Sequence, residues 1–218
     1  MAEFRNRSEA GRALAAALAH KGVADAVVYA LPRGGVPVAA EVARALKAPL
    51  DVILVRKLGA PGQPELAIGA VADGNNPTTV LNDAIVRELA IAPETIRRIS
   101  AAAFAEIERR RRVFRAAAAA ISPVGGTAII VDDGLATGAT MEVAVKSLRK
   151  AGARRIVVAL PVAPRDAVSR LETIADDVVC LLTPAPFHSV GAHYEDFAQL
   201  TDADVMDALR ASAAPDGV

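Results

Sequence analysis

The sequence predicts an α/β protein built on an open parallel β-sheet with helices on both faces. In the second half of the chain, apolar segments of strand length alternate with helical segments, which is the pattern of βαβ units. These strands are almost continuously apolar, as expected of parallel strands buried on both faces. Only 3% of the residues are aromatic and none is tryptophan, so alanine, valine, leucine and isoleucine must form the core. We therefore expect strands at 127–131, 154–160 and 177–182 and helices at 138–151 and 165–175.

The first half of the chain is less regular, and its elements follow from local signals. Ser8 is the expected N-cap of a first helix at 8–20, and Pro37 has a permissible place in the first turn of a helix at 36–46. Residues 56–66 contain two glycines and two prolines, which predicts a mobile loop. The other expected elements are strands at 26–31, 51–55, 67–72 and 78–81 and helices at 82–90 and 93–115.

The length of 218 residues favours a single domain spanning 1–218. Within it, residues 56–126 hold the flexible loop and a helical excursion. Residues 183–201 break the alternation of strands and helices and contain Phe187, Tyr194 and Phe197, so we expect them to form a small hood. Thr201 and Asp204 form a capping-box pattern, which predicts a last helix.

Charge and composition exclude several functional classes. The 25 basic residues balance 25 acidic ones and 53% of the chain is hydrophobic, which excludes wholesale disorder and argues against a protein that coats nucleic acid. A single cysteine, Cys180, excludes an internal disulfide framework, and with three histidines it argues against structural zinc. No apolar run reaches the roughly 18 residues of a membrane span, and the polar start lacks a signal peptide's apolar stretch. We expect a soluble cytoplasmic protein with neither a membrane nor a nucleic-acid partner.

The stretch 128–141 combines an apolar strand, two carboxylates, a turn of glycines and threonines, and the start of a helix. Because ligands of open α/β sheets bind outside the carboxyl ends of the strands, this turn lies where a ligand is expected. Its glycines allow successive N–H groups to point at one anion, and the helix start adds positive potential. We therefore expect a phosphate to bind at Leu135, Ala136, Thr137, Gly138, Ala139 and Thr140.

Asp132 and Asp133 stand next to this turn, where their charge would repel a phosphate. Carboxylates accept hydrogen bonds from hydroxyl groups, and they bind magnesium or its waters. A ligand with a monophosphate at one end and vicinal hydroxyls nearby is a ribose 5-phosphate. The residues therefore predict a phosphorylated pentose together with Mg²⁺, held by Asp132 and Asp133 directly or through water.

Other phosphate-binding motifs fit the sequence poorly. A Walker A loop requires a lysine after its last glycine, and no lysine follows Gly138. A dinucleotide-binding G-x-G-x-x-G is absent from the chain, and too few residues follow Asp133 for a full receiver domain. A tight turn with solvated aspartates is the plain structural alternative.

The run VDDGLATGAT at 131–140 closely resembles the phosphoribosyl diphosphate (PRPP) signature of type I phosphoribosyltransferases, in which an acid pair after an apolar strand precedes T-G-x-T. The likeness extends to LPRGGVPVA at 31–39, DVILVRKLGAPGQPELAIGAV at 51–71 and VVCLLTPAPF at 178–187. Together these segments resemble a bacterial phosphoribosyltransferase-like group of unassigned acceptor. The resemblance implies the type I phosphoribosyltransferase fold, a PRPP site and Mg²⁺ as cofactor.

The same resemblance suggests where the diphosphate of PRPP would bind. Carried over to LPRGGVPVA, it implies that Arg33 contacts diphosphate oxygens and that Gly34 and Gly35 offer backbone N–H groups. In the family this loop often contains a strained peptide bond. A plain turn that enters a helix is the alternative.

Arg56 and Lys57 follow the apolar strand 51–55. By resemblance they would act in catalysis with Asp132 and Asp133, neutralising the departing diphosphate. A pair of cations that merely extend from a strand end to solvent is the alternative. The loop after them resembles the family's flexible loop, which closes over PRPP, and Glu65 within it is a weak candidate for an acid–base group.

We therefore expect an enzyme that transfers the phosphoribosyl group of PRPP to a small-molecule acceptor and releases diphosphate. The acceptor would be a nucleobase or a similar nitrogen heterocycle. Phe187 and Tyr194 of the hood could stack on a planar acceptor or could only pin the hood to the sheet. A non-catalytic PRPP-binding regulator and a hydrolase of phosphoribosyl compounds are the competing classes, and a homodimer is left open.

Overall fold

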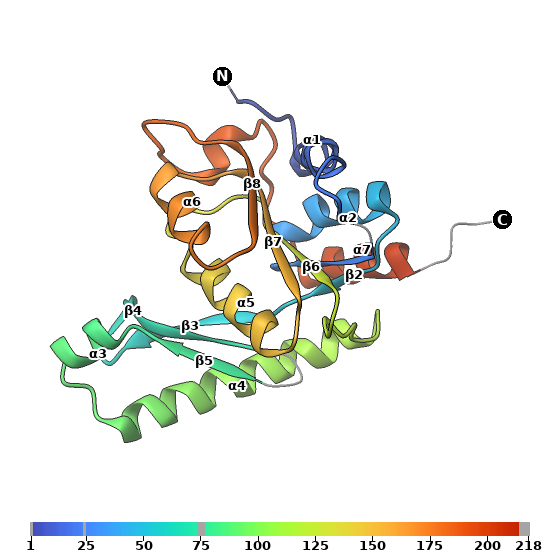
Figure 1. The fold of residues 1–218 in the computed structure, drawn as a ribbon. Coiled ribbons are helices and arrows are strands. Elements are labelled where there is room, and N and C mark those ends of the chain that lie inside the picture. The colour runs from blue at the N-terminus through green and yellow to red at the C-terminus, as the bar shows by residue number, and fades with distance from the viewer. Residues whose placement is uncertain (1, 24, 74–76, 214–218) are drawn as a thin grey trace.

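A five-stranded parallel sheet in the order β2-β1-β6-β7-β8 forms the centre of the protein in the computed structural model (Figure 1). The structure describes residues 2–23, 25–73 and 77–213, and only the backbone of Glu65 and Ala213. The candidate role of Glu65 therefore lies outside the described side chains. The predicted α/β class and parallel sheet are confirmed. The strands are β1 (Ala26–Ala30), β2 (Leu50–Val52), β6 (Thr127–Val131), β7 (Arg155–Val162) and β8 (Asp177–Leu182).

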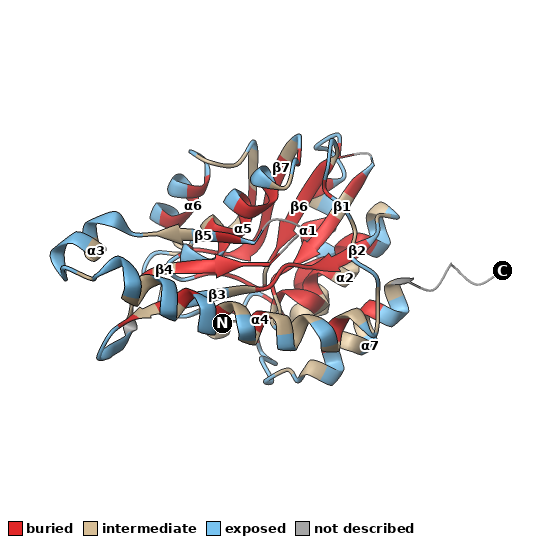
Figure 2. Cartoon of the chain, turned by 90° about the horizontal axis from the view of Figure 1, so that it is seen from below, coloured by how far each residue is buried: buried red, intermediate tan, exposed pale blue. Residues whose placement is uncertain are grey.

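Helices cover both faces of this sheet, as predicted. In Figure 1, α1 (Arg7–Leu18), α2 (Gly35–Leu46) and α7 (Asp202–Ala213) lie on one side, and α5 (Ala139–Lys150) and α6 (Arg165–Leu171) on the other. Successive side chains of β6 point to opposite faces of the sheet. Ile129 packs against the side of α1, α2 and α7, and Ile130 packs against the side of α5 and α6. Both side chains are fully buried, and Figure 2 shows buried strands beneath helices whose outer faces are exposed.

The predicted N-terminal cap of α7 is found in the structure, whereas the cap of α1 is a different residue from the one predicted. Asn6, not Ser8, is the N-cap of α1: its side chain accepts a hydrogen bond from the backbone N–H of Glu9 at 3.0 Å. Both residue types are good caps, and Asn6 is the one with extended backbone angles. The capping box before α7 is confirmed. Asp204 accepts from the Thr201 N–H at 2.7 Å, and Thr201 Oγ1 accepts from the Asp204 N–H at 3.3 Å.

A second, antiparallel sheet follows β2, where the sequence suggested a mobile loop. It consists of β3 (Val55–Ala60), β4 (Gln63–Ala72) and β5 (Thr78–Leu81) in the order β3-β4-β5. The loop prediction for 56–66 is wrong because its glycines and prolines shape a hairpin. Gly62 takes a positive φ of +75° in the turn, and a side chain at Gly59 would lie 2.5 Å from Pro64 O. The predicted strand 51–55 is therefore divided between two sheets.

The antiparallel sheet lies between two helices. The long α4 (Pro93–Arg115) packs on one of its faces and α5 on the other, while the short α3 (Asp83–Glu88) follows β5. None of the described helices is long and apolar enough to cross a membrane. Because α5 also covers the parallel sheet, it joins the two sheets at the end where β6 finishes.

The beginning of the chain pairs with the segment after β8. Phe4 forms an isolated parallel bridge with Tyr194, which follows the short helix η1 (Val190–His193). The Phe4 N–H donates to His193 O at 3.0 Å, and the Glu195 N–H donates to Phe4 O at 2.9 Å. Segments that are far apart in the sequence are thereby held against the carboxyl end of β6.

Candidate functional site

Two carboxylates end the central strand β6. Asp133 is buried, with 8% of the residue exposed, and Asp132 is half-buried. Asp132 Oδ1 accepts a hydrogen bond from the Asp133 N–H at 2.9 Å, which orients its side chain. Burial raises the pKa of both carboxyls, and the charge of Asp133 further raises the pKa of Asp132. Such a pair is stabilised by cations or hydroxyl donors brought close to it.

The turn after the acid pair leads directly into the N-terminus of α5. Gly138 is the N-cap, with φ +79°, a conformation that favours glycine. The neighbouring Ala136, Thr137, Ala139 and Thr140 are exposed around this helix end. Since the first N–H groups of a helix have no partner within it, the turn presents donors and positive potential to solvent.

Leu135 does not fit its predicted role in phosphate binding. Its N–H donates to Val162 O at 3.2 Å, and its side chain belongs to the buried core. Its assignment is therefore wrong, because its amide already bonds within the fold. Arg170 of α6, which no sequence motif indicated, donates from Nη2 to Thr137 O at 2.8 Å and brings a cation to the turn.

The predicted diphosphate loop lies against the acid pair, because β1 and β6 are neighbouring strands. The Pro32–Arg33 peptide bond is cis, and Gly34 is the N-cap of α2. A Cβ atom on Gly34 would lie 2.1 Å from Asp133 Oδ2, and one on Gly35 would lie 2.6 Å from the backbone oxygen of Val131. Neither glycine can carry a side chain without displacing its neighbours, so the loop and the end of β6 form one packed unit.

Arg33 is held by the segment that leads into α7. Its Nη1 donates to Leu200 O at 2.6 Å, and its Nε lies 3.2 Å from Asp202 Oδ1. The Arg33 side chain is 40% exposed. This member of the predicted diphosphate loop therefore has its guanidinium bound to the protein's own carboxylate and carbonyl.

Arg7, in the first turn of α1, is a site residue that the sequence analysis missed. Its Nε lies 2.7 Å from Asp133 Oδ2, and its guanidinium carbon lies 3.8 Å from the centre of the Phe197 ring. Arg7 also lowers the pKa of Asp133, against the raising effect of burial. No local pattern links residues 7 and 133, so only the fold reveals this pair.

A cavity of about 480 Å³ opens beside Asp133 and the Gly34 loop. Two arginines line it from different elements, and the segment after Tyr194 closes another side. Its lining residues are Arg7, Arg33, Gly34, Asp133, Phe197, Gln199 and Leu200. The volume is within the range of small-molecule sites, and the lining supplies both cationic and carboxylate groups.

Arg56 and Lys57, which were both expected to neutralise the departing diphosphate, do not share one face of the structure. They are successive residues of β3, so their side chains project to opposite faces of the antiparallel sheet. Arg56 faces α4, where its Nη1 lies 4.0 Å from Glu106 Oε1. Lys57 lies opposite Ala70 in the neighbouring strand β4. Their side chains are on the face of the antiparallel sheet that packs against Val143 of α5. Lys57 is therefore on the side of the α5 turn and Arg56 is not.

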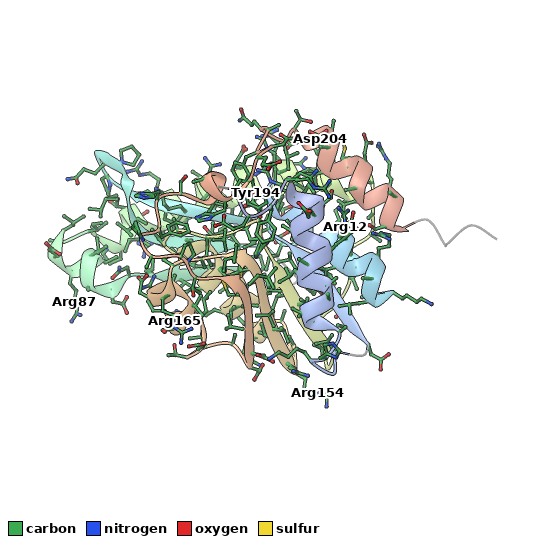
Figure 3. The ribbon with its side chains drawn as sticks, turned by 90° about the horizontal axis from the view of Figure 1, so that it is seen from above. Arg12, Arg87, Arg154, Arg165, Tyr194 and Asp204 are labelled. Atoms are coloured by element: carbon green, nitrogen blue, oxygen red, sulfur yellow. The ribbon has the colours of Figure 1, made fainter. Side chains whose placement is uncertain are left out.

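Phe187 and Tyr194, the two candidate acceptor contacts in the hood at 183–201, lie in different environments. Tyr194, labelled in Figure 3, is buried between Phe4 and Phe197, and its hydroxyl donates to Asp133 O at 2.6 Å. Of the two roles considered for Tyr194, the structure favours anchoring, since its ring is already packed and its hydroxyl ties the hood to β6. Phe187 is half-buried and stacks on His193, with ring centres 5.8 Å apart.

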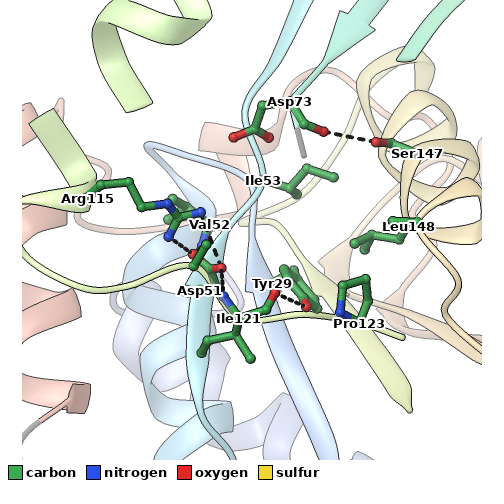
Figure 4. A pocket seen from close by; sticks show the side chains of 12 residues that line it. Tyr29, Asp51, Val52, Ile53, Asp73, Arg115, Ile121, Pro123, Ser147 and Leu148 are labelled. Carbon is green, nitrogen blue, oxygen red and sulfur yellow. Dashed lines mark hydrogen bonds and ion pairs between the residues drawn. The ribbon is translucent and has the colours of Figure 1, made fainter. Parts of the chain in front are cut away.

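A smaller cavity of about 50 Å³ lies in the interior, between β2 and α5 (Figure 4). Asp51 is 2% exposed and accepts hydrogen bonds from Arg115 Nη1 at 2.5 Å and from the Ile121 N–H at 2.9 Å. The Tyr29 hydroxyl donates to Ile121 O at 2.9 Å. These bonds tie the segment after α4 to the parallel sheet. The cavity can hold water but is too small for a nucleotide.

Comparison with known proteins defines the class. A family model for the phosphoribosyl transferase domain matches residues 5–196, so the chain belongs to the phosphoribosyl transferase family. Two curated relatives from Mycobacterium tuberculosis, MT0597 of strain CDC 1551 / Oshkosh and Rv0571c of strain ATCC 25618 / H37Rv, carry provisional phosphoribosyl transferase names. Each is 47% identical over 203 residues, which is 93% of this chain. The chain spans 45% of the length of these relatives.

The fold is shared with a solved structure. The crystal structure of TT1426 from Thermus thermophilus is 45% identical in sequence and superposes with a TM-score of 0.86. The match covers 97% of this chain and 100% of the TT1426 chain. The resemblance noted in the sequence is therefore confirmed at the level of family and fold.

Proposed function

We propose that this chain is a magnesium-dependent phosphoribosyltransferase that transfers the phosphoribosyl group of PRPP to a nitrogen heterocycle. Membership of the family supports the reaction class. The observation that carries the proposal is the contact of Gly34 with Asp133, where a Cβ atom would lie 2.1 Å from Oδ2. It joins a candidate diphosphate loop to a candidate ribose-binding carboxylate, and the α5 turn begins immediately after that carboxylate.

Each part of PRPP would meet groups of suitable chemistry. The 5-phosphate would bind at 136–140, where exposed residues surround the N-terminus of α5. The ribose hydroxyls would donate to Asp132 and Asp133, and the diphosphate would bind the loop at 33–35. Lys57 would add a cation from the hairpin, whereas Arg56 on the other face would not.

The transfer would occur at C1 of the ribose. An acceptor nitrogen attacks C1, the bond from C1 to the diphosphate oxygen breaks, and the diphosphate leaves with the electron pair. The acceptor nitrogen then loses its proton to water or to a base. Positive charge develops on the ribose, so the contribution of the protein is to position the reactants and to provide electrostatic stabilisation.

The acid pair suits magnesium as a cofactor. Carboxylate oxygens are preferred Mg²⁺ ligands, and Mg²⁺ often binds to one or two carboxylates together with substrate phosphates and water. Among the described residues there is no cluster of three or more histidine, cysteine or acidic side chains, so the ligand and water would supply the further oxygens. Asp132 is the better candidate for a Mg²⁺ ligand because it is half-buried, whereas Asp133 is buried and paired with Arg7. When bound, Mg²⁺ would neutralise charge on the diphosphate.

The test measures diphosphate release from PRPP across a panel of nucleobases and related heterocycles. The proposal predicts release that depends on a particular base and is lost in Asp132→Asn. Release that is equal with and without any base would indicate a hydrolase. PRPP binding without release would indicate a regulatory protein on this fold, and absence of PRPP binding would reject the site.

A further inference from the structure

Arg7 occupies a position that is unfavourable for helix formation alone. It is the first residue of α1, where the helix dipole repels a cation. Its side chain is only 11% exposed, and a buried guanidinium is costly unless its charge and donors are satisfied. The contacts that Arg7 makes with other segments must therefore account for its presence.

Those contacts join two parts of the proposed PRPP site. Arg7 Nε lies 2.7 Å from Asp133 Oδ2, and both side chains are nearly buried, 11% and 12% exposed. The guanidinium also lies 3.8 Å over the ring of Phe197, and its Nη1 donates to Ala198 O at 2.9 Å. One side chain thus fixes both the carboxylate at the end of β6 and the segment that lines the cavity.

We infer that Arg7 is a positioning residue for the ribose part of the site, an inference that rests on the proposed function. Gly34 limits where the Asp133 carboxylate can move, and Arg7 holds one of its oxygens. The carboxylate is thereby oriented before the ligand arrives, so that ribose hydroxyls meet an acceptor that needs no rearrangement.

Arg7 and Arg33 have different roles, although both line the same cavity. Arg33 is 40% exposed and belongs to the predicted diphosphate loop, so it can turn toward an incoming anion. Arg7 is nearly buried, and its guanidinium is held by a carboxylate, a ring and a carbonyl. Its influence on the ligand therefore passes through Asp133.

The experiment compares Arg7→Met with Arg12→Met. Arg12, labelled in Figure 3, lies on the same helix, and its 51% exposed side chain pairs with Glu41 at 3.3 Å. Calorimetry would measure the affinity of each protein for ribose 5-phosphate and for inorganic diphosphate, with melting temperature beside them. We expect Arg7→Met to bind ribose 5-phosphate about tenfold more weakly and to change diphosphate affinity less than about twofold. Arg12→Met should change neither affinity.

Arg7→Lys keeps the inference testable if the methionine variant does not fold. A lysine can restore the charge beside Asp133, but it cannot also cover Phe197 and reach Ala198 in the way that a planar guanidinium does. Relative to the wild type, we expect Arg7→Lys to bind ribose 5-phosphate more weakly, by less than about tenfold, with the affinity for diphosphate nearly unchanged.

Other outcomes would overturn the inference. Unchanged affinities for both ligands would show that Arg7 does not position the site. Equal losses for both ligands with a lower melting temperature would assign it a purely structural role, and loss of diphosphate binding alone would make it a direct ligand contact. Wild-type protein that binds neither ligand would reject the proposed function as well.

Discussion

Gly34→Ala tests whether the Gly34 loop and Asp133 form one unit. The backbone of Gly34 has φ −57° and ψ −40°, angles that alanine adopts without strain. The new Cβ would nevertheless lie 2.1, 2.5 and 2.7 Å from the three carboxyl atoms of Asp133. To restore an ordinary contact of 3.4 Å, the nearest oxygen must move by about 1.3 Å. The whole effect of the substitution should therefore act through Asp133.

The size of the effect follows from the bond that this movement breaks. Asp133 Oδ2 lies 2.7 Å from Arg7 Nε, and a displacement of about 1 Å is enough to lose that hydrogen bond. Hydrogen bonds to charged groups contribute about 1.5–3 kcal/mol. We expect Gly34→Ala to lower the free energy of unfolding by about 2 kcal/mol, which corresponds to about 4–8 °C in melting temperature for a domain of this size. PRPP affinity should fall in parallel.

The assay is a double-mutant cycle measured by urea unfolding. Asp133→Ala alone should cost about 3–5 kcal/mol because it leaves Arg7 buried without its carboxylate. In that background Gly34→Ala no longer meets a carboxylate, so it should be neutral or stabilising by up to about 1 kcal/mol. Gly126→Ala is the matched control, since its Cβ would meet nothing closer than Pro123 O at 3.8 Å. If Gly34→Ala costs the same in both backgrounds, or costs nothing in the wild type, the reasoning is refuted.

Four further predictions follow from the same geometry. Arg33→Ala should weaken binding of PRPP and diphosphate but leave ribose 5-phosphate nearly unchanged in calorimetric titrations, and equal losses for all three would make Arg33 structural. Asp202→Asn removes a carboxylate that competes with diphosphate for Arg33, so it should tighten diphosphate binding about two- to fivefold, as expected of a partly exposed ion pair. Asp207→Asn on the exposed side of α7 is the control, and equal diphosphate affinities of the two variants would contradict the competition. Phe187→Ala should raise the KM for the acceptor by the equivalent of about 1–3 kcal/mol without changing the affinity for PRPP. Weaker binding of both the acceptor and PRPP, with a lower melting temperature, would mean that the ring only anchors the hood. Asp73 is 5% exposed, and burial raises its pKa to about 6, so its folded state binds the proton more tightly than the unfolded chain does. Stability should therefore fall by about 2 kcal/mol as pH rises from about 4 to about 6. Asp73→Asn should flatten this part of a pH series of unfolding curves, and a slope that survives in the variant would exclude burial of this carboxyl as its cause.

Periodicity and turn chemistry were enough to predict the part of the fold that bears the acid pair. Strand β6 is apolar throughout because it is buried on both faces, and the glycines and threonines after Asp133 could be read directly as a turn that enters a helix. The same reasoning failed for 56–66. There, Gly59 and Gly62 indicate a loop by composition, although they serve the close contact and the turn of a hairpin.

The parts of the site that were missed depend on contacts between distant residues. Arg7 and Asp133 meet because α1 and β6 come together in the fold, and nothing in the residues around Arg7 marks that contact. The separation of Arg56 from Lys57 would have followed from strand alternation if β3 had been recognised as a strand. Tyr194 was recognised as an aromatic residue of the hood, but its burial depends on Phe4 at the other end of the chain.

The pairing of Phe4 with Tyr194 has a consequence for the order in which the protein folds during synthesis. Phe4 and Arg7 are synthesised before the strands, whereas their partners at 193–198 are made after all the described strands of both sheets. A nascent chain that ends at Leu182 contains every parallel strand and the acid pair, yet it lacks the segment that anchors Arg7. Since domains begin to fold as they emerge, the sheets can form early, but the cavity beside Asp133 can close only when translation of this region is nearly finished.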